Sequence, residues 1–254
     1  MKPDYKNWMP KGMVFGFLAA TGVALLMSLV FGMAGFIGKI LLVIGIFLAI
    51  ITIWMFLMYR AFSYNGSRQM SKQIIEGVSS YVKIPDGGKG LDVGCGSGAL
   101  TIACAKKNPH AQMVGIDRWG KEYASFSKTL CESNAKAEGA TNVSFDQGDA
   151  TKLEFEEETF DAVTSNYVYH NIPSRDRQAI LLETLRTLKK GGTFAIHDIM
   201  SKSKYGDMQS FAQKLKDMGY EDVKLIDTTS GMFMSKFEAT WMGLSGSTIL
   251  MGRK

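Results

Sequence analysis

The feature that most constrains this chain is an apolar run that stops at three glycines spaced two apart, Leu91-Asp92-Val93-Gly94-Cys95-Gly96-Ser97-Gly98. Such a turn lets a ligand approach the main chain closely, and the apolar helix that follows presents free N–H groups there. The spacing differs from the dinucleotide-binding G-x-G-x-x-G pattern, and no phosphate-binding Gly-Lys-Ser/Thr follows. The turn therefore predicts a site for a nucleoside without phosphates, with a structural turn that binds no ligand as the alternative.

Beyond this glycine turn, short apolar strands alternate with helices. We predict strands at residues 113–116, 143–145, 160–165, 192–199 and 223–226, with Phe237 to Met251 as the last, and helices at residues 100–107, 121–138, 175–188 and 208–218. This alternation predicts an α/β fold, a mostly parallel sheet with helices on both faces. Ligands of such sheets bind outside the carboxyl ends of the strands, so the residues that follow each strand are the site candidates.

The first sixty residues contain two long uncharged segments. Met13 to Ile37 and Ile40 to Tyr59 each reach the roughly 20 residues that a helix needs to cross about 30 Å of hydrocarbon. We therefore predict two transmembrane helices, at about residues 13–37 and 40–59, joined by a tight turn at Gly38 and Lys39 in an N-terminal domain of residues 1–62. A cleaved signal peptide would have a shorter apolar part, and a buried helical pair would need a larger core.

Positive charge flanks both ends of this hairpin. The outer flanks carry Lys2, Lys6, Lys11, Arg60, Arg68 and Lys72, and the turn carries only Lys39. Because cytoplasmic flanks hold the excess of Lys and Arg, we expect both termini, and the domain of residues 63–254, in the cytoplasm. The prediction is an integral protein of the plasma (inner) membrane, with the lipid bilayer as a partner.

Charge and cysteine content exclude several other classes. The formal net charge of +5 is concentrated beside the apolar segments, so it indicates membrane orientation, and we expect no nucleic-acid partner. Cys95, Cys104 and Cys131 form no C-x-x-C pair, which argues against a disulfide framework and against a metal site. A reducing compartment suits this cysteine content. The sequence sets no oligomeric state.

Five ordered motifs resemble those of class I S-adenosylmethionine-dependent methyltransferases. They are the glycine turn, Gly115-Ile116-Asp117, Gly148-Asp149-Ala150, Phe160-Asp161 and Leu188-Lys189-Lys190-Gly191-Gly192. The resemblance covers about Ser67 to Lys254 and leaves the hairpin outside. It implies a Rossmann-like, seven-stranded sheet whose last strand, here Phe237 to Lys254, inserts antiparallel. It also implies S-adenosylmethionine as cofactor and S-adenosylhomocysteine as product.

The resemblance further implies roles for residues that follow the strands. Asp117 stands where a carboxylate accepts the ribose hydroxyls, and Asp149 where one accepts from the adenine amino group. Trp119 either covers the adenine face or is a surface residue, and Asp92 is placed to meet the ammonium end of the donor. The expected cofactor-binding residues are Asp92, Gly94, Cys95, Gly96, Gly98, Asp117, Arg118, Trp119, Asp149, Ala150 and Asn166.

Methyl transfer from a sulfonium is a direct displacement, in which the protein mainly aligns the acceptor with the methyl group and the leaving sulfur. A base is needed only where the acceptor carries a proton. Tyr167, His170 and His197 are the catalytic candidates, because they follow the fourth strand or end the fifth. Each histidine could equally be a hydrogen-bonded structural residue, and we expect His110 to face solvent.

Together these expectations describe a membrane-anchored methyltransferase whose acceptor is a membrane-associated or apolar small molecule, such as a quinone or a lipid. The methionine-rich segment from Gly231 to Ser235 is a candidate wall for this acceptor, or plain core. Two alternatives remain open. One is methylation of a small thiol or amine, and the other is a non-catalytic membrane module that binds S-adenosylmethionine.

Overall fold

The computed structural model describes residues 2–120 and 125–254 of the chain. The chain forms two compact units. The hairpin unit is Lys6–Lys72, and the sheet unit joins residues 2–5 to Gln73–Lys254.

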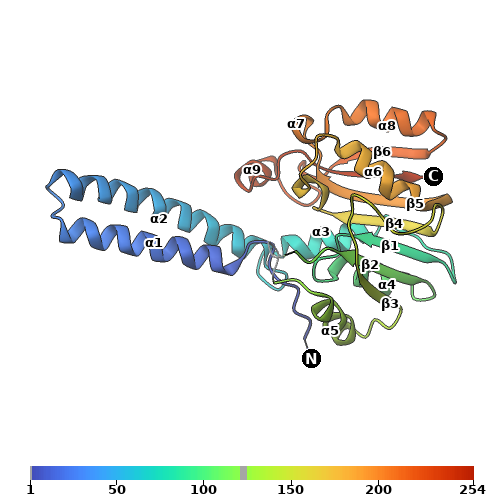
Figure 1. The fold of residues 1–254 in the computed structure, drawn as a ribbon, viewed down its shortest axis with the longest axis horizontal. Coiled ribbons are helices and arrows are strands. Elements are labelled where there is room, and N and C mark those ends of the chain that lie inside the picture. Colours follow the sequence, from blue (N-terminus) through green and yellow to red (C-terminus); the bar gives the residue numbers. More distant parts are fainter. Residues whose placement is uncertain (1, 121–124) are drawn as a thin grey trace. The chain divides into compact units, whose positions relative to one another are not determined.

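The hairpin unit contains two long apolar helices, α1 (Lys11–Val30) and α2 (Phe36–Phe62) (Figure 1). Both are long and apolar enough to cross a membrane, and only 17% of the most apolar window of each is buried. Polar side chains join the two helices. The hydroxyl oxygens of Thr21 and Thr52 lie 3.1 Å apart, and the Ser28 hydroxyl donates a hydrogen bond of 2.8 Å to the Gly38 carbonyl.

The connection between these helices lies earlier than we predicted. Because α1 ends at Val30 and α2 begins at Phe36, Gly38 and Lys39 belong to the first turn of α2. Gly32 has a φ of 77°, the left-handed conformation that commonly ends a helix, and a Cβ on Gly38 would stand 2.0 Å from the Gly32 oxygen. The turn therefore depends on one glycine for its backbone angle and on another for close approach.

The sheet unit is built on seven strands in the order β3-β2-β1-β4-β5-β7-β6. Strands β1 to β5 are parallel, and β7 runs antiparallel to both β5 and β6, which confirms the predicted Rossmann-like fold with an antiparallel last strand. The bounds are β1 Lys89–Val93, β2 Gln112–Asp117, β3 Val143–Gln147, β4 Phe160–Asn166, β5 Leu188–Ile199, β6 Glu221–Asp227 and β7 Ser247–Arg253.

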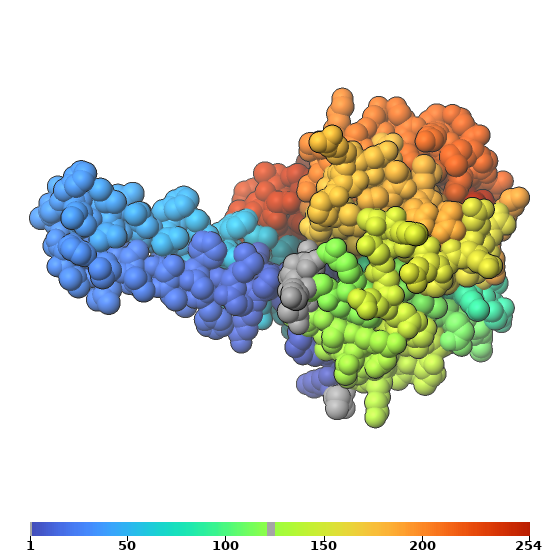
Figure 2. Space-filling model, in the orientation of Figure 1, coloured from blue at the N-terminus to red at the C-terminus, as the bar shows by residue number. Residues whose placement is uncertain are grey.

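Helices cover this sheet. α4 (Ala99–Lys107) contacts β2 and α5 (Lys128–Glu138) contacts β3, while α6 (Arg177–Arg186) contacts β5 and α8 (Met208–Asp217) contacts β6. The yellow and orange segments, α6 and α8 among them, form much of the visible face of the sheet unit in Figure 2. Leu181, Phe194 and Phe211 lie in the apolar core beneath, each at most 1% exposed. The residues that the structure describes also form the helices α3 (Met70–Ser79), α7 (Lys202–Tyr205) and α9 (Lys236–Trp241) and a 3-10 turn, Tyr169–Asn171.

The C-terminal part corrects one prediction, since only Ser247–Arg253 of the expected strand from Phe237 to Lys254 is extended. The stretch before it contains α9, which begins with a capping box. The Ser235 hydroxyl accepts from the Glu238 N–H at 3.2 Å, and the Glu238 carboxylate accepts from the Ser235 N–H at 2.8 Å. This Ser-x-x-Glu spacing was the sequence signal that we missed.

Two other boundaries differ from expectation. β5 begins at Leu188, before the predicted turn, and residues 189–192 bulge out of its ladder, since Phe160 pairs with Leu188 and Ala162 with Thr193. The helix predicted at residues 121–138 is helical from Lys128, after a Ser127 side chain that caps it, and residues 121–124 lie outside the described residues.

Candidate active site

The strand order reverses between β1 and β4, because β2 and β3 lie on one side of this pair and β5 on the other. In open α/β sheets, ligands bind in the crevice outside the carboxyl ends of the strands at such a switch point. The glycine turn follows β1, and residues 167–171 follow β4. The fold therefore brings the glycine turn and the predicted catalytic residues after β4 to the same edge of the sheet.

The glycine turn has a left-handed backbone at Gly94, Gly96 and Gly98, where φ is 75°, 57° and 82°. A Cβ on Gly94 would lie 2.3 Å from a methyl group of Val168, so the turn passes directly against the loop after β4. No side chain in the described part of the chain caps the start of α4, and its first N–H groups therefore face the turn without a side-chain acceptor. Burial raises the pKa of the Cys95 thiol, so this side chain stays protonated within the turn.

Asp117, at the end of β2, is fixed to this turn. Its Oδ2 accepts from the Gly96 N–H at 2.8 Å, and its Oδ1 accepts from the Trp119 N–H at 2.8 Å. The Trp119 indole donates back to the Gly96 carbonyl at 3.0 Å, while Arg118 is exposed between them. A carboxylate has about four acceptor positions, so these bonds orient Asp117 and leave capacity for a ribose diol.

Asp149 lies just beyond the end of the neighbouring strand. Asp117 pairs with Gln147 in the β2–β3 register, so Asp149 follows two residues past the same edge of the sheet. Its side chain is exposed, and hydrogen bonds from the Thr151 hydroxyl and N–H keep the pKa of this carboxyl below its ordinary value. Ala150 is partly buried against the core.

Asp92 has a different environment from the one we predicted. It is 1% exposed, and its carboxylate accepts from the Thr101 hydroxyl at 2.6 Å and from the Thr164 hydroxyl at 3.0 Å. Burial raises its pKa to about 6. The side chain joins β1, α4 and β4 from within, so this geometry does not support direct contact with the donor. Asp92 stands between apolar residues of a strand, and the sequence does not show whether its carboxylate points into the core or toward the ligand.

Two residues of α5, which the sequence analysis did not select, hold the other side of the glycine turn. The Cys131 thiol donates to the Gly96 carbonyl at 3.2 Å, and the Asn134 amide donates to the Ser97 carbonyl at 2.9 Å. Their spacing of three residues places them on one helix face. That spacing was visible in the sequence, but nothing in it indicated what the face would contact.

His170 and Asp198 form a hydrogen-bonded pair at the ends of β4 and β5. His170 Nδ1 lies 2.5 Å from Asp198 Oδ1, and the His170 N–H donates to Oδ2 at 3.1 Å. The Asp198 side chain is fully buried, which by itself would raise its pKa, but the hydrogen bonds from His170 and the Ile199 N–H lower the pKa of Asp198 below its ordinary value. An ionised carboxylate can only accept, so Nδ1 carries the hydrogen of this bond, and in the neutral ring the lone pair is on Nε2.

His197 is fully buried and has partners on both ring nitrogens. Nδ1 lies 2.8 Å from the Asn166 Oδ1, and Nε2 lies 3.0 Å from the Thr228 hydroxyl. Burial lowers the pKa of His197 to about 3, so the ring is neutral and donates one of these bonds. This arrangement favours the structural alternative for His197, and it also engages the side-chain oxygen of Asn166, a residue that we predicted to bind the cofactor.

Tyr167 lies between the two histidines. Its ring centroid is 4.6 Å from that of His197 and 5.9 Å from that of His170, and its hydroxyl lies 2.7 Å from the Ser247 hydroxyl. Burial raises the pKa of Tyr167 above its ordinary value. Its φ of 56° is strained for a tyrosine, which is common at functional sites. The phenol therefore stays protonated and shapes the space beside His170.

Arg177, at the start of α6, holds the loop that carries His170. Its guanidinium donates to the carbonyls of Tyr169, Ile172, Ser174 and Lys204 at 3.0, 2.9, 3.1 and 3.0 Å. One planar cation thereby replaces the regular hydrogen bonds that this irregular segment lacks. The sequence contains no local signal for this role of Arg177, because every residue has the main-chain carbonyl that the guanidinium binds.

The methionine-rich segment is partly core. Phe233 and Met234 are 8% and 2% exposed, whereas Met232 is 45% exposed. The Phe233 ring packs 5.7 Å from the His197 ring, centroid to centroid, and a Cβ on Gly77 would stand 2.3 Å from it. Phe233 and Met234 therefore fit the core alternative, whereas Gly231, Met232 and Ser235 are exposed.

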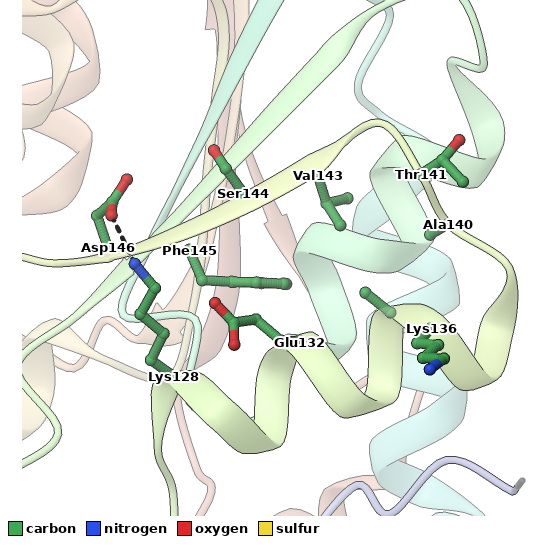
Figure 3. Close-up of a pocket in the computed structure, with 10 residues that line it drawn as sticks. Lys128, Glu132, Lys136, Ala140, Thr141, Val143, Ser144, Phe145 and Asp146 are labelled. Atoms are coloured by element: carbon green, nitrogen blue, oxygen red, sulfur yellow. Dashed lines mark hydrogen bonds and ion pairs between the residues drawn. The ribbon is translucent and has the colours of Figure 1, made fainter.

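A separate hollow of about 440 Å³ lies between α5 and β3, with the ion pair of Lys128 and Asp146 at 3.0 Å across it (Figure 3). None of the predicted donor or acceptor residues lines it. Within residues 2–120 and 125–254, no group of three metal-ligating side chains converges.

The methyl donor predicted from the motifs fits the switch point. Among the residues that the structure describes, the nearest side chain to a Cβ built on Gly96 is that of Phe126, at 4.0 Å. Asp117 ends β2 and Asp149 lies two residues past the end of the adjacent β3, where the two carboxylates suit the hydroxyl and amino donors of a nucleoside. Both groups are acidic, so the electrostatic potential at this edge of the sheet also favours a positively charged ligand such as a sulfonium.

Comparison with known proteins identifies the family. Residues 84–242 match the family model described as "Methyltransferase domain". The chain is 30% identical over 165 residues to a demethylmenaquinone methyltransferase of Lactobacillus johnsonii, covering 61% of this chain and 65% of that one. It is also 30% identical over 165 residues to the ubiquinone/menaquinone biosynthesis C-methyltransferase UbiE of Desulfotalea psychrophila, covering 65% of this chain and 60% of that one. The chain thus spans less than two thirds of the length of either relative.

The fold is also shared with solved structures. The cyclase SpnF matches with a TM-score of 0.57 at 18% identity, over 76% of this chain and 85% of that one. Such a likeness shows the fold alone, and the family model covers well over half of the chain. The resemblance stated from the motifs is confirmed: this chain belongs to the methyltransferase-domain family, whose cofactor is S-adenosylmethionine.

Proposed function

We propose that this chain is a membrane-anchored C-methyltransferase that transfers a methyl group from S-adenosylmethionine to a quinol-like ring in a lipid-soluble acceptor. The hydrogen-bonded pair of His170 and Asp198, beside the switch point, carries the proposal. The relatives named for menaquinone and ubiquinone biosynthesis support this class of acceptor. The donor residues in this proposal are the glycine turn, Asp117 and Asp149.

The acceptor chemistry explains why a base is useful. A ring carbon beside a phenol becomes strongly nucleophilic when the phenol loses its proton, and His170 Nε2 is the group that takes it. Bound S-adenosylmethionine supplies an electrophilic methyl group on a positively charged sulfur, which leaves as a neutral thioether. The methylated ring then releases the hydrogen of the attacked carbon as a proton, and the oxygen regains one, so one proton is lost overall.

Asp198 makes this base effective. Its carboxylate fixes the His170 tautomer by accepting from Nδ1, and its negative charge stabilises the imidazolium that forms when Nε2 takes a proton. The second Asp198 oxygen accepts from the His170 main chain, which sets the ring position. Arg177 holds the rest of the loop. Tyr167 and Phe233 supply apolar surface beside these groups, as a ring-shaped acceptor requires.

A panel of acceptors tests the proposal. The full chain in lipid nanodiscs is incubated with methyl-labelled S-adenosylmethionine and, separately, a short-chain quinol, the oxidised quinone, a thiol and an amine. We expect label in the quinol alone, because only the quinol has an ionisable O–H and a nucleophilic ring carbon. Label in the thiol or the amine instead would refute the proposal that the acceptor is a quinol. Donor binding without transfer to any acceptor would favour a non-catalytic module.

Two histidine variants test the base. His170→Gln is expected to lower kcat on the quinol about 10²- to 10⁴-fold, the usual range for removal of a general base. Donor affinity should be kept, and raised pH should restore part of the rate because it ionises the phenol without help. His110→Gln is the matched control, since His110 is exposed. Equal rates for both variants would exclude His170 as the base.

Membrane anchoring by the hairpin unit is part of the proposal. It is supported by the length and apolar surface of α1 and α2, in which Phe36 is 80% exposed and Val30 is 69% exposed. Exposure of that kind is unfavourable in water and suits lipid. The flanking Lys and Arg residues support cytoplasmic termini. A reporter fused after Lys254 should be active only in the cytoplasm, and a reporter inserted after Met33 only outside it; the reverse pattern would overturn the orientation.

A further inference from the structure

The N-terminal strap, residues 2–5, belongs to the sheet unit although it precedes the hairpin in the sequence. The Asp4 N–H donates to the Asn134 Oδ1 at 2.7 Å, and the Asn134 Nδ2 donates to the Asp4 carbonyl at 3.1 Å. One side-chain amide thus satisfies both main-chain groups of a single residue, as a neighbouring β-strand would. Tyr5 is only 8% exposed, and the strap ends beside α5 (Figure 1).

The same amide reaches the glycine turn. Asn134 Nδ2 donates its other hydrogen bond to the Ser97 carbonyl at 2.9 Å, and one helical turn earlier Cys131 donates to the Gly96 carbonyl. Asn134 is 1% exposed and Ser97 is 7% exposed, so these bonds are shielded from water. The orientation of Asn134 is therefore set by the strap on one side and sets the peptide groups of the turn on the other.

We propose that the N-terminal strap is part of the donor site, with Asn134 as a positioning residue that couples strap docking to S-adenosylmethionine binding. This inference rests on the proposed function of the glycine turn. When the strap is away, the Asn134 amide loses two partners in a buried place and must turn or hydrate to recover them. Either change releases the Ser97 carbonyl, and the turn loses the fixed backbone on which the donor binds. Asn134 contacts the main chain of Asp4, so its own link to the strap depends on the amide hydrogen at position 4.

Two substitutions test this dependence. Asp4→Pro removes the N–H that Asn134 accepts from and leaves Asn134 itself in place. Asn134→Ala removes the coupling residue and leaves the strap sequence intact. In the full chain in nanodiscs, we expect each change to raise the Kd for S-adenosylhomocysteine, measured by calorimetry without acceptor, about tenfold, which is about 1.4 kcal/mol.

Asn142→Ala is the stability control. Asn142 is also an amide that donates to three carbonyls, those of Ala105, Asn108 and Ala111, but none of them belongs to the glycine turn. Its loss should lower the unfolding temperature and leave the Kd unchanged. A merely structural strap would give the opposite pattern, in which Kd follows stability across all three variants.

Reciprocity supplies a second measurement. If strap docking favours the donor, the donor must favour strap docking by the same factor. Hydrogen exchange of residues 2–5 in the wild-type chain should therefore slow when S-adenosylhomocysteine is added. Unchanged exchange together with an unchanged Kd in Asp4→Pro and Asn134→Ala would overturn the inference. A wild-type chain that binds no donor would overturn the proposed function and this inference with it, whereas failure to methylate any acceptor leaves both binding measurements decisive.

Discussion

Burial of His197 makes the stability of the sheet unit sensitive to acid. Its pKa is lowered from the ordinary 6.5 to about 3, because the folded chain shields the ring from water. Between these two values the unfolded chain binds a proton that the folded chain does not, so the free energy of unfolding falls as the pH drops below about 6.5. At 1.36 kcal/mol per pKa unit, the free energy of unfolding falls by about 2 kcal/mol between pH 6.5 and about pH 5, and by about 5 kcal/mol once the pH reaches about 3.

Asp92 contributes with the opposite sign. Burial raises its pKa from 3.8 to about 6, so between these values the folded chain holds a proton that the unfolded chain has released. The free energy of unfolding therefore rises as the pH falls through about 6, by about 1.4 kcal/mol at pH 5. The contributions of His197 and Asp92 partly cancel in the wild-type chain, so its own pH profile does not separate them.

Variants separate the two contributions. We would unfold the full chain in detergent with denaturant at about pH 7.5 and about pH 5, following tryptophan fluorescence, for wild type, His197→Gln and Asp92→Asn. On acidification, His197→Gln should lose about 2 kcal/mol less stability than wild type, and Asp92→Asn about 1.4 kcal/mol more. Glutamine and asparagine keep hydrogen-bonding groups, so the comparison isolates the proton. The same pH dependence in all three proteins would refute the assignment of a neutral, buried His197.

Three further substitutions follow from single contacts. Gly94→Ala should destabilise the fold by about 2–4 kcal/mol in denaturant unfolding, because it combines a left-handed φ with overlap on Val168, and Val168→Ala should restore part of the loss. Arg177→Lys should cost about 2–3 kcal/mol and lower kcat more than donor affinity, since lysine cannot span the same carbonyls; an equal effect on both would contradict its role in placing the loop. Ser235→Ala should cost about 1 kcal/mol through the lost helix cap, while Ser235→Thr should be close to neutral in the same unfolding measurement.

Features that depend on neighbours in the sequence were predictable. The order of strands and helices follows from apolar runs and turn residues, and the positive φ angles at Gly94, Gly96 and Gly98 follow from the glycine spacing itself. The position of Asp117 beside that turn follows from parallel strands that share one edge. Where local signals compete, the prediction was wrong: the apolar residues around Phe237 suggested a strand, whereas the cap at Ser235 starts a helix.

What the sequence by itself determined is therefore the α/β sheet and the methyltransferase family, and it also placed the candidate site at the carboxyl ends of the strands. Only the tertiary structure decided which side chains meet. It paired His170, in the segment after β4, with Asp198, and it buried His197, near the end of β5, between Asn166 and Thr228. It buried Asp92 between two threonines, and it joined Asp4 to Asn134 across 130 positions. The physical reason is that burial and hydrogen-bond geometry depend on strand register and helix packing, which bring together residues with no local sequence relation.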